Sequence, residues 1–198
     1  VIGLGTAALL IGSKINYKFW KKYALFIFLA GFFVTLLVFA PGIGFEHAGA
    51  KRWLALGPFS FQPSELLKFG FVLYLASWIS SRRAEISSFR FGLLPFLVIT
   101  GLVGMVLIFQ PDIGTLGVIA ITAAFLFFLG GGRFFQIGIL LLLGISLLSV
   151  LIFFKPHLSP RIQVFLNPGI DPQGIGYQLR QSLIAFGSGG FFGRGFGM

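Results

Sequence analysis

The sequence contains no cysteine and little charge. None of its 198 residues is Cys, and only 10% are charged, five of them acidic. The absence of cysteine excludes disulfides, thiolate metal sites and cysteine nucleophiles. Soluble domains carry about 25% charged residues, so this composition is typical of a membrane protein instead.

Histidine is also scarce. His47 and His157 stand alone in predicted loops, with no carboxylate at metal-ligand spacing, so no zinc site is predicted. The stretch "GRGFGM" follows no strand and is not a nucleotide-binding fingerprint. The sequence shows no internal repeat and no Ser, His and Asp order that suggests a hydrolase triad.

Long apolar runs dominate what is present. They lie between short polar breaks, and each is long enough to cross about 30 Å of hydrocarbon. We therefore predict an all-α, polytopic membrane protein that forms one membrane domain over residues 1–198, with about five full transmembrane helices and one partial one. The spans are expected at Val1–Gly12 (partial), Tyr23–Ala40, Pro63–Ser81, Gly92–Phe109, Ile113–Gly130 and Phe134–Phe154.

Two longer polar segments separate or follow these spans. Residues 41–62 are predicted to be a polar loop, and residues 155–198 a large extracytoplasmic loop. Within the latter, Asn167-Pro168 and Asp171-Pro172 predict turns, and "YQLRQSLIAF" predicts a short amphipathic helix that stops at "GSGG".

The basic residues indicate the orientation. The formal net charge is +10, but the basic residues lie at the ends of apolar runs, so we predict topogenic signals and no nucleic-acid partner. The connections between spans fall into two alternating sets, one on each side of the membrane. One set has eight Lys and Arg residues in short segments, and the other has six in much longer segments. Cytoplasmic connections retain positive charge, so the first set is predicted to be cytoplasmic. The predicted cytoplasmic set is Lys14, Lys18, Lys21, Lys22, Arg82, Arg83, Arg90 and Arg133.

Glu65 and Lys68 lie three residues apart inside a predicted span. On a helix they share one face and can pair. Ionisable groups in a span usually face a water-filled cavity or a partner. The alternatives are a structural ion pair between helices, or a Lys68 side chain that extends to the membrane surface.

Arg52 and Trp53 directly precede this helix. One interpretation is an interfacial Trp with an Arg near lipid head groups. The other is recognition of a phosphate joined to a sugar or an isoprenoid, because guanidinium binds phosphate oxygens in a bidentate manner and the ring offers a flat apolar face.

Further polar residues are predicted on the same outward side. Asp112, in "QPDIGT", is placed to cap the next helix, with Gln110 and Thr115 beside it as structural or cavity residues. The C-terminal loop adds Arg161, Asp171 and Gln178 as binding candidates, and Gln62 joins them from the start of the third span.

Three stretches together resemble the SEDS family of shape, elongation, division and sporulation proteins. They are "KRWLALGPFSFQPSELLK", "QPDIGT" and "FLNPGIDPQGIGYQLRQSLIAFGSGGFFGRGFG". The resemblance runs from about Lys14 to the last residue and is closest to the cell-division branch, although the elongation and sporulation members share the pattern. It implies a ten-span protein of the bacterial cytoplasmic membrane, here without its first and last three spans.

The resemblance implies a peptidoglycan glycosyltransferase that polymerises lipid II for septal or lateral wall synthesis, together with a class B penicillin-binding transpeptidase and membrane lipid. The resemblance then implies that the substrate is bound by eight residues: Arg52, Trp53, Gln62, Glu65, Lys68, Arg161, Asp171 and Gln178. The family's proposed catalytic aspartate has no counterpart here and is expected beyond residue 198, so the fragment should be inactive. The cofactor is left open, with a divalent cation such as Mg²⁺ as a candidate. The alternatives are a lipid-precursor flippase or transporter, and a non-catalytic scaffold for a transpeptidase.

The predicted orientation can be tested by labelling, since the sequence has no cysteine of its own. A cysteine in place of His157 should react with an impermeant thiol reagent added from outside the cell. Reaction at this position only from the cytoplasmic side would contradict the predicted topology.

Overall fold

The computed structural model describes residues 2–41, 44–47, 50–56, 59–154, 159–167, 169–171, 173–191 and 193–195. The chain divides into two compact units, Val1–Leu140 and Leu141–Met198.

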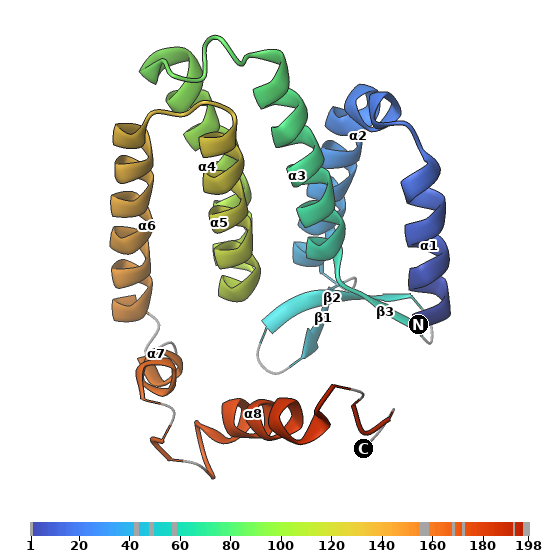
Figure 1. Ribbon diagram of the computed structural model, residues 1–198, viewed down its shortest axis with the longest axis vertical. Coiled ribbons are helices and arrows are strands. Elements are labelled where there is room, and N and C mark those ends of the chain that lie inside the picture. Colours follow the sequence, from blue (N-terminus) through green and yellow to red (C-terminus); the bar gives the residue numbers. More distant parts are fainter. Residues whose placement is uncertain are drawn as a thin grey trace. The chain divides into compact units, whose positions relative to one another are not determined.

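Helices make up most of the first unit, and they coincide with the predicted spans (Figure 1). Among the described residues, the segments long and apolar enough to cross a membrane are Tyr17–Phe39, Phe89–Phe109 and Phe134–Phe154, with a shorter apolar helix at Ile113–Leu129. The prediction of a polytopic α-helical membrane protein is confirmed. The helices are α1 (Ile2–Lys14), α2 (Tyr17–Leu36), α3 (Pro63–Ser81), α4 (Leu94–Phe109), α5 (Ile113–Leu129) and α6 (Phe134–Phe154), which continues into the second unit.

Helix α2 begins earlier than the apolar run alone predicts. Asn16 is extended, and its side-chain oxygen accepts a hydrogen bond from the Lys18 backbone N–H at 3.0 Å. This is the bond that an N-cap residue makes to an otherwise unpaired donor. The basic residues Lys18, Lys21 and Lys22 therefore belong to the first turns of α2.

The segment predicted as a loop after α2 contains a small antiparallel sheet, reached through the 3₁₀ turn η1 (Leu37–Phe39). Its strands pair in the order β1 (Gly44–His47), β2 (Ala50–Leu56) and β3 (Phe59–Phe61). Leu54 is buried and pairs with Phe61. Figure 1 shows the sheet at the end of the unit where α2 finishes and α3 begins. Backbone pairing satisfies polar groups that an irregular loop would leave for water.

Two glycines bring the backbones of α2 and α3 into direct contact. A β-carbon at Gly70 would lie 2.9 Å from the Ile27 carbonyl oxygen, and one at Gly31 would lie 3.1 Å from the Leu67 backbone. Small residues permit such close packing between helices in lipid, where the hydrophobic effect between helices is weak. The side chain of Leu67 is fully buried at this contact. Helices α2 and α3 are therefore closely packed along this contact.

The predicted cytoplasmic turns lie at one common end of the first unit. Lys21 Nζ donates to Ser80 Oγ at 3.4 Å, which joins the start of α2 to the end of α3. Gln136 Nε2 donates to the carbonyls of Ser87 and Ser88, both at 3.3 Å, which joins the start of α6 to the turn after α3. We call this the basic end. The opposite end, which carries the sheet and the α4–α5 turn, is the sheet end.

The second unit contains the remainder of α6, the short helix α7 (Ser159–Leu166) and α8 (Tyr177–Gly189). The predicted amphipathic helix is confirmed as α8, which ends at Gly190 with a positive φ of 53°. Helix α7 was not predicted, because its eight residues mix polar and apolar types within a Pro-containing stretch. His157 lies outside the described residues.

Substitution of Gly70 tests the close packing of α2 and α3. Gly70→Leu should lower the free energy of unfolding by about 1–3 kcal/mol, because an added side chain meets main-chain atoms that cannot rotate away. The measurement is thermal unfolding in detergent. Gly101→Leu on α4 is the control, since a β-carbon there meets no atom within 4 Å. Equal effects of the two substitutions would contradict the packing.

Candidate functional site

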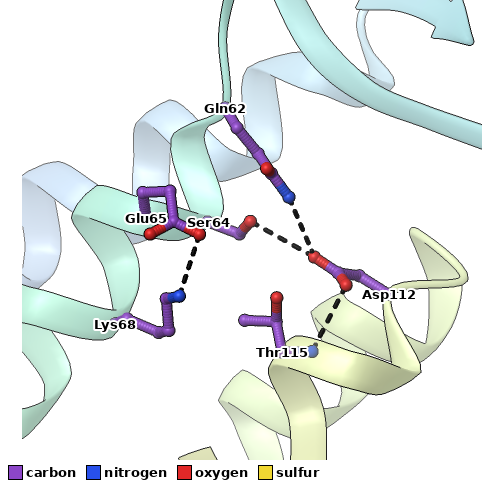
Figure 2. Close-up of polar contacts among 6 residues, drawn as sticks. All are labelled: Gln62, Ser64, Glu65, Lys68, Asp112 and Thr115. Carbon is purple, nitrogen blue, oxygen red and sulfur yellow. Dashed lines mark hydrogen bonds and ion pairs between the residues drawn. The ribbon is translucent and has the colours of Figure 1, made fainter. Parts of the chain in front are cut away.

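A buried carboxylate, that of Asp112, joins α3 to α5 at the sheet end. Gln62 Nε2 donates to Asp112 Oδ2 at 3.3 Å, and Ser64 Oγ donates to the same oxygen at 3.2 Å. The Thr115 backbone N–H donates to Oδ1 at 3.3 Å, so Asp112 is the N-cap of α5, as predicted. Figure 2 shows Gln62 and Ser64 pointing from the start of α3 toward this carboxylate. Asp112 is only 5% exposed, so its hydrogen bonds replace those that water would make.

Gln110 joins the same turn to α2. Its side chain is 2% exposed, and its Nε2 donates to the Thr35 carbonyl at 2.8 Å. The Thr35 hydroxyl in turn donates to the Gly31 carbonyl at 2.7 Å. Gln110 also follows the last residue of α4, and its backbone N–H donates to the Val106 carbonyl. Its side chain therefore joins the C-terminal end of α4 to α2.

Arg52 joins the sheet to the α4–α5 turn. Its Nε donates to the Gln110 carbonyl at 3.2 Å, and its Nη2 donates to the Pro111 carbonyl. Carbonyls at the C-terminal end of a helix lack intrahelical donors and carry partial negative charge, so a guanidinium is a favourable partner for them. Nη1 makes no hydrogen bond with any residue that the structure describes.

These contacts form one network around "QPD", with partners on α2, β2 and α3. The Asp112 carboxylate accepts three hydrogen bonds, which occupies most of its lone pairs. A carboxylate engaged in this way holds its neighbours in position and is poorly placed to remove a proton. The structure therefore brings Arg52, Gln62, Gln110, Asp112 and Thr115 together; the sequence had predicted that they share one side of the protein, but not these contacts.

Trp53 follows Arg52 on β2, at an irregularity in the strand pairing. Across the sheet, Phe45 pairs with Trp53 and Glu46 with Lys51, so Arg52 is an extra residue of β2 at a bulge, where the regular alternation of side chains is interrupted. Trp53 is half-buried and pairs across the sheet with Phe45. Recognition of one ligand by both side chains stays a prediction.

The predicted pair on α3 forms. Lys68 Nζ lies 2.8 Å from Glu65 Oε1, and their side chains are 29% and 57% exposed. Figure 2 shows the pair on α3, where Glu65 directly follows Ser64, the residue that donates to Asp112. The pair therefore adjoins the network without a described hydrogen bond to it. Whether it lines a cavity in the whole protein stays a prediction.

The candidates from the C-terminal loop belong to the second unit. Asp171 accepts from the backbone N–H groups of Gly174 at 3.0 Å and Ile175 at 3.2 Å, so its carboxylate stabilises a turn. Gln178 is exposed on α8, where its carbonyl accepts from the Ser182 hydroxyl. The side chain of Arg161 lies outside the described part of the structure. Their role in binding stays a prediction.

Every described acidic side chain has a partner. Asp112 and Asp171 accept the hydrogen bonds given above, Glu65 pairs with Lys68, and Glu85 pairs with Arg82 at 3.3 Å. The remaining acid, Glu46, has its side chain outside the described part. Within that part, no group of three or more His, Cys, Asp or Glu side chains could hold a metal ion. No ligand set for Mg²⁺ is therefore assigned.

Sequence reasoning missed two members of the network, Ser64 and Thr35. Both are almost fully buried, at 1% and 0% exposed. Ser64 lies between Pro63 and Glu65, where a small hydroxyl in an apolar segment was the available signal. Thr35 could not be recognised from the sequence, because it accepts the hydrogen bond from Gln110 through its backbone carbonyl, a group that every residue has.

The comparisons with known proteins identify the family. The model of the FtsW, RodA and SpoVE family, described as "Cell cycle protein", matches residues 1–198. The chain belongs to this family. Its motifs had predicted the same family under the name SEDS. The chain spans about half the length of the curated relatives that it matches, since the alignments cover 53% of the two described next.

One relative is a probable peptidoglycan glycosyltransferase FtsW from Coxiella burnetii, 40% identical over 196 residues and 99% of this chain. Another is the stage V sporulation protein E of Bacillus subtilis, 36% identical over 98% of this chain. The SEDS chain is thus similar to both division and sporulation members along nearly its whole length.

Solved structures agree with the fold. A peptidoglycan synthase complex, described as coordinating polymerization and crosslinking, matches with a TM-score of 0.71 and 28% identity over 93% of this chain and 54% of that one. The rod shape determining protein RodA of Thermus thermophilus matches with a TM-score of 0.63 and 28% identity over 75% of this chain and 47% of that one.

Removal of the Asp112 carboxylate tests the network. Asp112→Ala should lower the free energy of unfolding by about 2–4 kcal/mol, because it removes a helix cap and leaves a buried donor on Ser64 and a half-buried donor on Gln62 without an acceptor. Asp112→Asn, which keeps an acceptor oxygen, should cost less. Thermal unfolding in detergent measures both.

Glu85→Ala is the control for this prediction, since it removes the same charge from an exposed pair. It should cost less than about 1 kcal/mol. A cost for Asp112→Ala no larger than that of Glu85→Ala would show that Asp112 does not hold α3 and α5 together.

Proposed function

We propose that the protein to which this chain belongs is a peptidoglycan glycosyltransferase that polymerises lipid II. The observation that carries the proposal is the 40% identity over 99% of the chain to a relative named as a probable peptidoglycan glycosyltransferase. The polar groups at the sheet end, together with the Arg52 guanidinium, fit such a substrate. A lipid-linked pyrophosphate needs cations near the membrane interface, and its glycan needs polar partners.

Arg52 is the candidate for the anionic part of lipid II. Two of its donors hold the carbonyls of Gln110 and Pro111, which fixes the orientation of the guanidinium, and Nη1 has no described partner. A guanidinium held in place loses little conformational entropy when it binds phosphate oxygens. The other residues proposed to bind lipid II are Gln62, Glu65 and Lys68 at the start of α3, and Trp53, Arg161, Asp171 and Gln178.

The general base is proposed to lie outside these 198 residues. A sugar hydroxyl is too weak an acid to attack unaided at neutral pH, so a positioned base is needed. The described carboxylates are all engaged with partners, as Asp112 is by three donors. The matched relatives are about twice as long as this chain, which leaves room for such a residue.

The proposed partner is a penicillin-binding transpeptidase, and the proposed location is the bacterial cytoplasmic membrane. A structural neighbour of this chain is a synthase complex described as coordinating polymerization with crosslinking. The apolar helices of this chain require a bilayer. Our orientation of the positive charges places the sheet end outside, where the wall is built.

The test uses the full-length protein with its transpeptidase partner and purified lipid II. Arg52→Ala should raise the lipid II concentration for half-maximal polymerisation by roughly 10-fold or more, because a charge-assisted contact is lost. The maximal rate should change less. The measurement is gel analysis of the glycan chains, with thermal unfolding alongside to detect loss of the sheet contact.

Lys51→Ala is the matched control, since Lys51 is an exposed cation on the same strand. It should leave the half-maximal concentration nearly unchanged. If Arg52→Ala keeps normal lipid II dependence, Arg52 has only its structural role. If the full-length protein moves lipid II across vesicle membranes but makes no polymer with its partner present, the glycosyltransferase proposal fails and a flippase replaces it.

A further inference from the structure

A cavity unrelated to the Asp112 network lies between α3 and α5 at the basic end. Its volume is about 280 Å³, and it is lined by Ala76, Ile79, Leu126 and Leu129, with Ser80 and Arg83 as its polar members. This volume is near the lower limit of about 300 Å³ for ligand pockets, so it fits part of a ligand whose remainder lies outside. The lining combines an apolar wall with one cation and one hydroxyl.

The local charges favour an anion at the mouth of this cavity. Arg83 is exposed and makes no hydrogen bond or ion pair with any residue in the described ranges. The Lys21 ammonium lies 3.4 Å from Ser80 Oγ, which brings a second cation to the polar side of the cavity. Glu85, the nearest acid in sequence, pairs with Arg82 instead. The net charge beside the cavity is therefore positive.

The shape of the helices supports the apolar half of the site. A β-carbon at Gly130 would lie 2.2 Å from Ile79 Cγ2, so this glycine allows α3 and the end of α5 to approach closely at the cavity. Leu129 and Ala76 are exposed beside this contact and offer an apolar surface next to the cavity. An acyl chain can thus continue from the cavity into the bilayer without a break in apolar contact.

We propose that this cavity binds an anionic phospholipid, with its phosphate on Arg83, Ser80 and Lys21 and the start of one acyl chain against Ile79 and Leu126. The orientation of the basic end assigns the lipid to the cytoplasmic leaflet, where basic residues attract anionic lipids. The site is separate from the sheet end, and the proposal does not depend on the glycosyltransferase activity.

Native mass spectrometry of the full-length protein in detergent tests the site. The protein is titrated with phosphatidylglycerol and with phosphatidylcholine of the same acyl chains. Phosphatidylglycerol should bind more tightly, and Arg83→Gln should weaken it about fivefold, which corresponds to ~1 kcal/mol for one basic residue near a membrane. Phosphatidylcholine binding should change little.

Two further variants make the outcome specific. Arg82→Gln removes an equal charge from the adjacent residue, which does not line the cavity, and should leave phosphatidylglycerol binding nearly unchanged. Ala76→Phe fills the cavity without any change of charge and should weaken both lipids; it decides the question if Arg83→Gln does not fold. Equal effects of the two arginine variants, no preference for the anionic lipid, or unchanged binding by Ala76→Phe would each overturn the proposal.

Discussion

Burial of a carboxylate between helices is the constraint on which the sheet end depends. The free-energy cost of removing the Asp112 carboxylate from water is large, and it is offset only if donors stand at fixed places around it. Gln62 and Ser64 supply two from the start of α3, and the first turn of α5 supplies the third. The position of α3 relative to α5 is therefore fixed by hydrogen-bond directions, which apolar packing alone would leave less well defined.

The same requirement explains why the polar residues gather around one turn. Between α4 and α5 the backbone leaves helical hydrogen bonding, and in a membrane protein each freed carbonyl needs an internal partner. Arg52 supplies donors from the sheet, and the Gln110 side chain satisfies a carbonyl of α2 nearby. Binding chemistry placed here would use side chains that are already ordered, which lowers the entropy cost of holding a ligand.

Local signals predicted much of this arrangement from the sequence. Apolar runs gave the helices, Pro63 and Asp112 marked two helix starts, and the three-residue spacing gave the Glu65–Lys68 pair. The sheet was missed because its strands are short and lie in a polar stretch without clear alternation. The link from Gln110 to Thr35 could not be predicted, because it joins residues 75 positions apart through a backbone carbonyl.

The glycine contact between α2 and α3 has a mechanical consequence. At Gly31 and Gly70 main chain lies against main chain, so at these two points no side chain between the helices could rearrange to permit sliding. The two helices should move together as one rigid body, with the basic turns at one end and the sheet at the other. A displacement of the basic turns would then be carried along the pair to the sheet, and a displacement of the sheet to the basic turns.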